Sequence, residues 1–265
     1  MTHILAVVNQ KGGVGKTTTA VNLGAALAEA GHRTLLIDCD PQANATRSLT
    51  PQSEVEHTIY DVLVDGSDVD DAVTATQVDG LDLIPSSQAL AGAEVELVNL
   101  AGREARLREA LGKLGTDGPY EVVLIDCPPS LGLLSVNALV AAHGVIVPVQ
   151  CEYLSLEGLG HLLRTLELVQ NRLNHDLELV GLLMTMFDPR TNLSSQVVEE
   201  VGRHFPRERF NTVIPRSVRL GEAPSYGEPV TRYAPTSPGA LASRALAGEV
   251  AKRLAQRSRR ASNSA

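Results

Sequence analysis

The sequence is poor in aromatic residues and in cysteine. Aromatic side chains account for 3% of its 265 residues, and tryptophan is absent. Since a chain of this length can bury a sizeable core, we expect alanine, leucine and valine to fill the interior. The three cysteines, Cys39, Cys127 and Cys151, are too few and too scattered for a disulfide framework, which fits a reduced, cytoplasmic environment.

Long apolar runs and clustered histidines are also missing. No stretch approaches the roughly 18 consecutive apolar residues that a transmembrane helix needs, so we expect no membrane span. Residues Met1 to His3 lead directly into an apolar segment, so we expect no signal peptide. The seven histidines show no metal-ligand spacing, which argues against a histidine-based metal site.

Positive charge is absent from one long segment. Residues 48–102 contain no lysine or arginine, and the acidic residues between 54 and 96 make this part of the chain a predicted acidic face. The formal net charge is −8, yet residues 150–265 hold 15 basic against 12 acidic side chains. A basic surface, if the fold forms one, therefore belongs to the second half. The alternative is two solvated faces of different charge.

The most informative segment is a glycine-rich loop at residues 9–18. It lies between an apolar run at 4–8, short enough for a buried strand, and a helix-forming run at 19–28. Glycines let successive N–H groups point at one anion, and the helix N-terminus adds its positive dipole end. Lys16 supplies charge for the outer phosphates, and the Thr17 hydroxyl suits Mg²⁺. We expect these residues to bind nucleotide: Lys11, Gly12, Gly13, Val14, Gly15, Lys16, Thr17 and Thr18.

This loop departs from the strict phosphate-loop pattern at its first glycine position, which holds Gln10. Beside it, Lys11 is a second cation at the mouth of the loop. Because Lys16 already serves the phosphates bound by its own chain, we expect Lys11 to reach phosphates held by a second copy.

Carboxylates follow two further apolar runs. Asp38 and Asp40 end the run at 33–38, and Asp126 ends the run at 120–126. The carboxyl ends of parallel strands gather ligands at one edge of a sheet, so we expect these groups near the loop. Asp126 is the predicted magnesium ligand, together with Thr17. Asp40 has two interpretations, a catalytic group or a helix cap before the proline that follows it.

Four segments, in order, resemble the ParA/Soj chromosome-partitioning branch of the ParA/MinD ATPases. They are the deviant loop at 11–18, D-x-D-P-Q-x-N at 38–44, D-x-P-P-S at 126–130, and I-P-R-x-x-R-L-x-E-A-P at 214–224. The resemblance implies that Asp40 positions the attacking water, that Lys11 and Lys16 take part in catalysis, and that backbone near Pro215 meets the adenine. ATP and Mg²⁺ are the implied cofactors.

The resemblance also implies partners. It implies an ATP-dependent homodimer that binds double-stranded DNA without sequence preference in the nucleoid. It further implies a ParB-type centromere-binding protein that stimulates hydrolysis through a basic segment, for which the acidic face at 54–96 is a candidate contact. The implied DNA contacts are Arg190, Arg219, Lys252 and Arg253. The alternative for each of these basic residues is an ordinary solvated or ion-paired surface side chain.

Two other functions share this loop. A MinD-like membrane ATPase needs an amphipathic C-terminal anchor, whereas residues 257–265 contain no bulky apolar side chain. An iron–sulfur reductase of the nitrogenase type needs cysteines that bridge two subunits, whereas Cys39 and Cys127 follow predicted buried strands. We therefore expect no membrane partner and no cluster.

Apolar runs alternate with helical patterns along the whole chain. This predicts an α/β fold, a single P-loop NTPase domain with a mainly parallel sheet of about seven or eight strands and helices on both faces. We assign residues 1–256 to this domain and expect the basic, polar residues 257–265 to form a disordered tail. Residues 50–80 are expected to form short helices.

Overall fold

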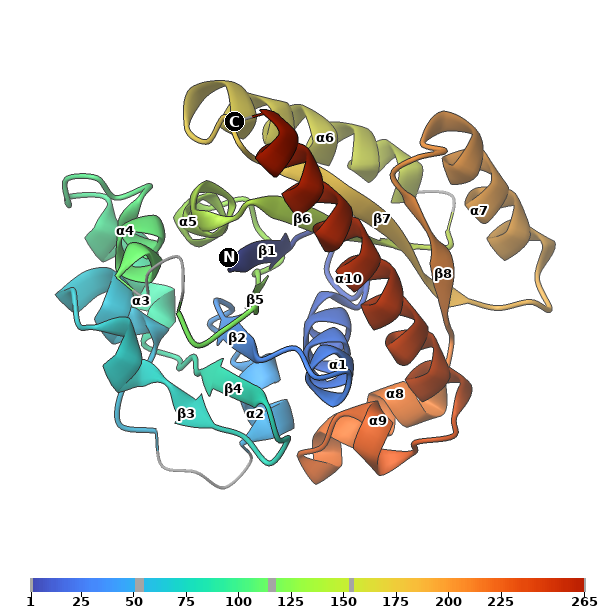
Figure 1. Cartoon of the computed structure of the whole chain (residues 1–265), viewed down its shortest axis with the longest axis horizontal. Helices are drawn as coiled ribbons and strands as arrows, with labels where there is room; N and C mark the ends of the chain where they lie inside the picture. The colour runs from blue at the N-terminus through green and yellow to red at the C-terminus, as the bar shows by residue number, and fades with distance from the viewer. Residues whose placement is uncertain (1, 51–54, 114–117, 153–154, 265) are drawn as a thin grey trace.

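The computed structural model describes residues 2–50, 55–113, 118–152 and 155–264 (Figure 1). Within these residues, eight strands form one sheet in the order β3-β4-β2-β5-β1-β6-β7-β8. The strands are β1 (His3–Val7), β2 (Thr34–Asp38), β3 (Thr74–Ala75), β4 (Leu81–Ile84), β5 (Val122–Asp126), β6 (Gly144–Gln150), β7 (Glu178–Phe187) and β8 (Arg209–Pro215).

Neighbouring strands run parallel except at one edge of the sheet. The short strand β3 pairs antiparallel with β4, and every other pair is parallel. Strand β1 lies between β5 and β6, so the loop that follows it leaves the middle of the sheet. The prediction of a mainly parallel α/β sheet is confirmed.

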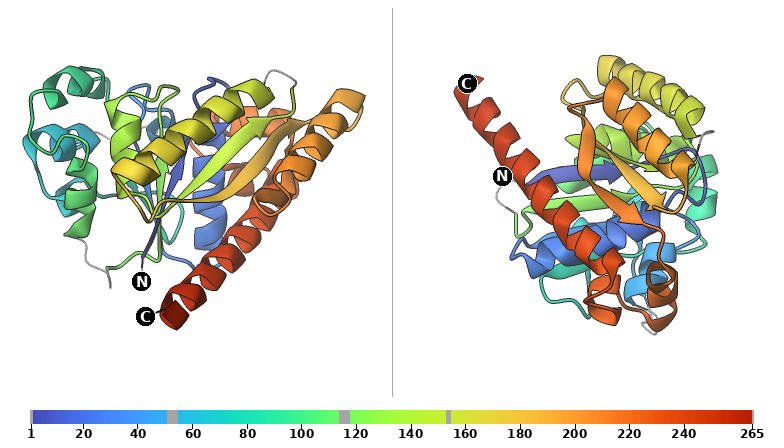
Figure 2. Two further views of the ribbon diagram at one scale, coloured as in Figure 1. Left: turned by 90° about the horizontal axis from the view of Figure 1, so that it is seen from above. Right: turned by 90° about the vertical axis from the view of Figure 1, so that its right-hand side faces the viewer.

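Helices cover both faces of the sheet, and each face has its own hydrophobic core (Figures 1 and 2). One face carries α3 (Leu90–Leu97), α4 (Arg106–Gly112), α5 (Leu133–Ala141), α6 (Ser155–Arg172) and α7 (Asn192–His204). The other carries α1 (Lys16–Glu29), α2 (Asn44–Leu49), α8 (Val218–Glu222), α9 (Val230–Tyr233) and α10 (Pro238–Ser264). Short helical turns lie at η1 (Asp61–Asp65), η2 (Val69–Ala72) and η3 (Ala223–Tyr226).

Aliphatic side chains fill both cores, as the composition predicts. Strands β2 and β5 are buried along their whole length, which explains why their sequences read as continuous apolar runs rather than alternating ones. Because the strand interiors are apolar, the carboxylates at their ends are fixed at one edge. None of the helices within the described residues combines the length and apolar composition that crossing a bilayer requires.

The C-terminus differs from the prediction. Helix α10 continues through Ser264, so the described part of residues 257–265 is helical rather than irregular. Arg257 explains part of this extension, because its Nη2 donates to the His143 carbonyl at 2.7 Å and pairs with Glu178 at 3.2 Å. These contacts attach the end of α10 to the starts of β6 and β7. The segment 50–80 contains η1 and η2 as expected, and also the edge strand β3.

Candidate nucleotide-binding site

The loop between β1 and α1 has the backbone shape that its glycines predict. Gly13 and Gly15 have φ values of 74° and 89°, in the left-handed region that other residues rarely adopt. A Cβ at either position would meet no atom within 4 Å, so conformation rather than space requires glycine here. Helix α1 begins directly after this turn, at Lys16, which aims its N-terminus into the loop.

Contacts with two neighbouring strands hold the loop in place. Asn9 donates through Nδ2 to the Pro148 carbonyl at 2.7 Å, and its Oδ1 accepts from the Lys11 N–H at 3.0 Å. From β7, the Thr185 hydroxyl donates to the Val14 carbonyl at 2.9 Å. Strands β6 and β7 therefore support the loop from the side, which keeps it shaped in the absence of ligand.

Lys16 lies inside the site rather than on its surface. Its side chain is buried, and its Nζ donates to the Lys11 carbonyl at 3.2 Å. Burial lowers the pKa of Lys16, whereas the negative charges of Asp126 and Asp40 raise it. The ammonium therefore lies close to both carboxylates, as a phosphate-binding lysine beside a metal site should.

Asp38 and Asp126 lie opposite each other in the register of β2 and β5, but their surroundings differ. Asp38 accepts hydrogen bonds from the Asp40 N–H at 3.1 Å and from Thr46, whose N–H and hydroxyl lie at 2.8 and 2.7 Å. These bonds make Asp38 an organiser of the turn that follows β2. Burial nevertheless raises the pKa of Asp38 to about 6.

Asp126 is fully buried, and among the described residues no donor makes a well-formed hydrogen bond to its carboxyl oxygens, although the Thr17 hydroxyl lies beside them. Burial and the nearby Asp38 raise the pKa of Asp126 well above its usual value, and the adjacent Thr17 hydroxyl acts in the opposite direction. An unpaired buried carboxylate is costly in free energy, and a bound cation would remove that cost. Asp126 and Thr17 thus fit the magnesium site that the sequence predicts.

Asp40 lines a cavity that Lys16 and Thr17 also line, and it is 7% exposed. Its Oδ1 accepts from the Gln42 N–H at 2.9 Å, and its carbonyl accepts from the Ser86 hydroxyl at 2.8 Å. It therefore shapes the turn after β2. It does not form the helix cap of the alternative interpretation, because α2 begins after Ala43 without a side-chain cap. The side chain also faces the cavity. The hydrogen bond to Gln42 therefore fixes the Asp40 carboxylate at the wall of this cavity, which is where a group that positions the attacking water would have to lie.

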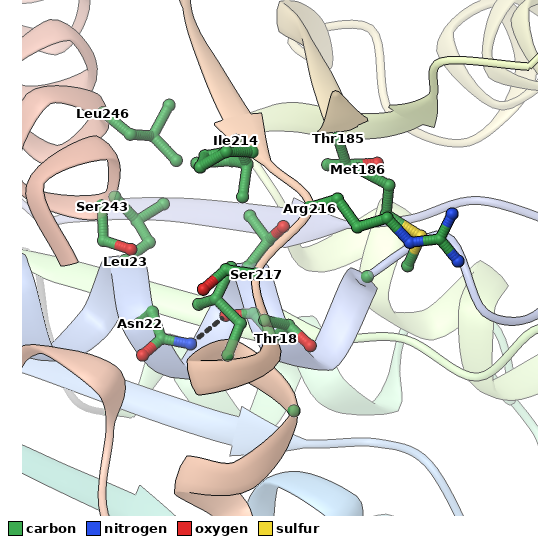
Figure 3. Close-up of a pocket in the computed structure, with 15 residues that line it drawn as sticks. Thr18, Asn22, Leu23, Thr185, Met186, Ile214, Arg216, Ser217, Ser243 and Leu246 are labelled. Carbon is green, nitrogen blue, oxygen red and sulfur yellow. Dashed lines mark hydrogen bonds between the residues drawn. The ribbon is translucent and has the colours of Figure 1, made fainter. Parts of the chain in front are cut away.

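Two adjoining cavities form a cleft along the N-terminus of α1. The phosphate-side cavity, with a volume of 690 Å³, is lined by the loop glycines, Lys16, Thr17 and Asp40. The base-side cavity, with a volume of 260 Å³, is lined by Thr18, Asn22, Pro215 and Leu246 among others (Figure 3). Gly15, Thr18, Asn22 and Met186 line both. The predicted position of Pro215 beside the base is consistent with this arrangement.

Some of these residues were not predicted from the sequence. Asn22 joins α1 to α9, because its Nδ2 donates to the Thr18 carbonyl at 2.7 Å and its Oδ1 accepts from the Val230 N–H at 2.7 Å (Figure 3). Met186, the residue before the last of β7, has a φ of 53°, an uncommon value for a residue with a side chain. No local pattern marks either residue, because the Val230 partner of Asn22 is distant in the sequence and the backbone conformation of Met186 is set by the fold.

Lys11 lies at the mouth of the loop, as predicted, but its side chain turns to its own chain. Its Nζ pairs with Glu152 at 3.1 Å, with 39% and 52% of the two side chains exposed. Gln150 also donates to Glu152, at 2.7 Å. Lys11 is not one of the described residues that line the two cavities.

The predicted DNA contacts fall into two groups. Arg190 pairs with Asp188 at 2.6 Å and is 84% exposed, Arg219 pairs with Glu222 at 2.8 Å and is 57% exposed, and Lys252 is exposed. These three side chains are accessible to a ligand.

The second group consists of Arg253, whose guanidinium is used inside the fold. The structure therefore does not support the prediction that Arg253 contacts DNA. Its guanidinium donates to the carbonyls of Val180, Glu208 and Arg209 at 2.6 to 2.9 Å and lies 4.1 Å from the centroid of the Phe210 ring. With 19% of the side chain exposed, Arg253 joins α10 to β7 and β8. The basic pattern near the C-terminus could not reveal these carbonyl partners.

Comparisons with known proteins agree with this site. Residues 2–179 match the family described as AAA domain. The chain is 55% identical over 252 residues to the sporulation initiation inhibitor protein Soj of Bacillus subtilis (strain 168), covering 95% of this chain and 99% of that protein. It is 50% identical over 252 residues to the chromosome partitioning protein ParA of Caulobacter vibrioides (strain NA1000 / CB15N), covering 95% and 94%.

A solved structure also matches most of the fold. The crystal structure of cobyrinic acid a,c-diamide synthase from Mycobacterium smegmatis with bound ADP and magnesium has a TM-score of 0.81 and 43% identity, covering 94% of this chain and 93% of that chain. The matches to Soj and to ParA each cover 95% of this chain. The chain therefore belongs to the ParA/Soj family of chromosome-partitioning P-loop ATPases.

Proposed function

We propose that this protein hydrolyses ATP with Mg²⁺ and uses the cycle to partition DNA. The observation that carries the ATPase part is the buried, unpartnered carboxylate of Asp126 beside Thr17 and Lys16. A phosphate-binding loop, a lysine and a cation ligand meet in one cavity. Family membership supports the partitioning part.

Each group in the cleft has a distinct task in this proposal. The loop N–H groups and Lys16 bind the phosphates, and the residues around Pro215 hold the base. Thr17 and Asp126 hold Mg²⁺, which, when bound, draws negative charge from the phosphate oxygens. Asp40 orients the attacking water, because a carboxylate near a triphosphate acts more readily by position than as a strong base.

Dimerisation is the proposed role of Lys11. In the ATP state, two copies meet at their nucleotide clefts, and Lys11 of each leaves Glu152 for the phosphates of the other. The exposed ion pair between Lys11 and Glu152 supports this exchange, because a solvated pair of this kind contributes only about 0–1 kcal/mol.

The proposed ligand of the dimer is double-stranded DNA, contacted through its phosphates by Arg190, Arg219 and Lys252 without reading bases. The exposure of these side chains supports the proposal. A ParB-type centromere-binding protein is the proposed activator of hydrolysis, with the acidic face at 54–96 as its candidate contact, and the protein acts on the nucleoid in the cytoplasm. Residue 54 of that face lies outside the described residues.

Co-sedimentation with DNA of unrelated sequence tests this function. We expect the protein to sediment with DNA in Mg-ATP and to remain in solution in ADP or without nucleotide. Equal sedimentation in all three conditions would contradict an ATP-controlled DNA clamp. ATP-dependent sedimentation with anionic lipid vesicles instead of DNA would favour the MinD-like alternative.

A further inference from the structure

A second hollow lies at the edge of the sheet opposite to the nucleotide cleft. Its wall includes Val145 near the start of β6 and residues 177–179 at the start of β7, whereas the nucleotide binds where strands end. Helices α6 and α7 cover this part of the sheet (Figure 2). The hollow has a volume of 440 Å³, within the range of about 300–1,000 Å³ that ligand pockets occupy. We call it the α6–β7 groove.

The floor of the α6–β7 groove is apolar. Val145, Leu166 and Leu177 are buried there as part of the core between the sheet and α6. Leu163, Leu179 and Phe205 pack against the same core but remain partly exposed. The groove is therefore an opening into the hydrophobic core, where a bulky apolar side chain would lose contact with water.

The rim of the groove is acidic. Three carboxylates surround the opening, Glu167 on α6, Glu178 at the start of β7 and Glu208 before β8. Among the described residues, Glu178 alone of these three forms an ion pair, with Arg257 at 3.2 Å. Glu167 and Glu208 thus keep negative charge that no ion pair within the described part of the chain neutralises.

This combination restricts the class of ligand. Nucleic acids and anionic membrane surfaces are repelled by three clustered carboxylates. A cationic segment is attracted by them, and an apolar floor adds binding energy only if that segment also carries a bulky apolar side chain. We propose that the α6–β7 groove binds a segment of a partner protein that inserts an apolar side chain between flanking lysines or arginines.

This partner site does not depend on the proposed function of the nucleotide cleft. Strands β6 and β7 separate the two sites along their length, so a nucleotide in the cleft does not cover the groove. Two copies that met at their nucleotide clefts would each leave the groove open. The groove therefore offers one contact point per chain in either nucleotide state.

Fluorescence anisotropy with three labelled peptides tests the proposal. One peptide combines phenylalanine and leucine with lysine, the second replaces lysine by glutamate, and the third replaces the apolar residues by serine. We expect the full-length protein to bind the first peptide at least about tenfold more tightly than either of the others, because both the apolar anchor and the positive flanks are needed.

Two matched double variants locate the binding. Glu167→Lys/Glu208→Lys reverses the rim, and Glu199→Lys/Glu200→Lys makes the same change in net charge on α7, away from the groove. We expect the rim variant to weaken binding about tenfold and the control variant to stay within about twofold of the original protein. Glu167→Lys alone, on exposed helix surface, should weaken binding in the same direction if the double variant folds poorly.

Several results would overturn the proposal. Equal weakening by the rim and control variants would mean that the peptide responds only to net charge. Equal binding of the serine peptide would mean that the apolar floor takes no part. Concentration-dependent self-association of the protein alone, lost in the rim variant, would assign the groove to a second copy of this chain instead.

Discussion

At the scale of single residues, the site depends on a contrast between two carboxylates with the same position in their strands. Asp38 accepts three hydrogen bonds, whereas among the described residues Asp126 has only the Thr17 hydroxyl as a neighbouring donor and accepts no well-formed hydrogen bond. The sequence predicts that both carboxylates lie at the same edge of the sheet. It cannot show which of them accepts hydrogen bonds from the protein itself. That difference arises because Thr46 folds back onto Asp38, while the strand that carries Asp126 lies deeper in the sheet.

Substituting each carboxylate by its amide should separate these roles. Asp38→Asn replaces one carboxylate oxygen by an amide NH₂, so it loses the acceptor of one or two of the three hydrogen bonds and should lower the free energy of unfolding by about 1–3 kcal/mol. Asp126→Asn removes an unpaired buried charge, so the ligand-free protein should unfold at the same or a higher temperature, while Mg-ATP no longer stabilises it. Thermal unfolding with and without Mg-ATP measures both, and a destabilised Asp126→Asn without ligand would contradict this assignment.

Substitutions of the two loop lysines, Lys16 and Lys11, should have different effects. Lys16→Ala should abolish nucleotide binding, because Lys16 is the buried cation of the cavity. Lys11→Ala should bind ATP and fail to dimerise, whereas Glu152→Gln, which releases Lys11, should dimerise at a lower protein concentration. Light scattering after gel filtration measures dimerisation. Lys113→Ala, which breaks an exposed pair with Asp68, serves as a control, and normal dimers of Lys11→Ala would exclude the cross-subunit role.

Asp40 can be tested by its effect on rate. Asp40→Ala should bind ATP but hydrolyse it on the order of 100-fold more slowly, because the water loses the group that orients it. Single-turnover hydrolysis is the measurement. A rate within about threefold of the original protein would leave Asp40 with only its turn role at Gln42.

At the scale of secondary structure, most elements follow from local patterns, and the exceptions have physical causes. Buried strands and the strand–loop–helix context of the nucleotide site are encoded by contiguous residues. Strand β3 is two residues long, and α2 begins after Ala43 in a left-handed conformation without a side-chain cap, so neither leaves a readable signal. The extent of α10 depends on contacts between Arg257 and distant strands.

The end of α10 should respond to pH. His3 bonds with Ser258, and the His143 ring accepts from the Ile4 N–H at 3.1 Å. Desolvation on burial is the main cause that lowers the pKa of both histidines. The pKa of His3 is lowered further by His143 and Arg257, and that of His143 is lowered further by Arg257 and raised by Asp176. Since the unfolded chain then binds more protons, stability should fall as pH drops below about 6.5.

Hydrogen exchange along α10 at pH about 7.5 and 5.5, corrected for intrinsic rates, measures this effect. We expect residues near 257–258 to exchange relatively faster at the lower pH. His143→Gln should reduce the difference between the two conditions, and His175→Gln, at an exposed position, should not. An unchanged profile in the original protein would show that the two histidines do not control this end of the helix.

At the scale of the whole molecule, charge must be segregated for DNA binding to occur at all. A chain with a net charge of −8 is repelled by DNA unless its basic residues face one way. The second half carries the cationic excess, and dimerisation would double any surface that it forms. Arg253 does not belong to that surface, because it is used inside the fold.

Arginine substitutions should therefore act on DNA binding in two different ways. The logarithm of affinity should fall against the logarithm of salt concentration with a slope of about −0.9 for each phosphate contact. Arg219→Ala removes an exposed contact and should make this slope less negative by roughly one, with equal losses on two unrelated duplexes. Arg253→Ala leaves three carbonyls without their donor and should lower stability while the slope stays unchanged. Anisotropy titrations in Mg-ATP at four salt concentrations distinguish these two outcomes. A changed slope in a folded Arg253→Ala protein would show that Arg253 contacts DNA after all.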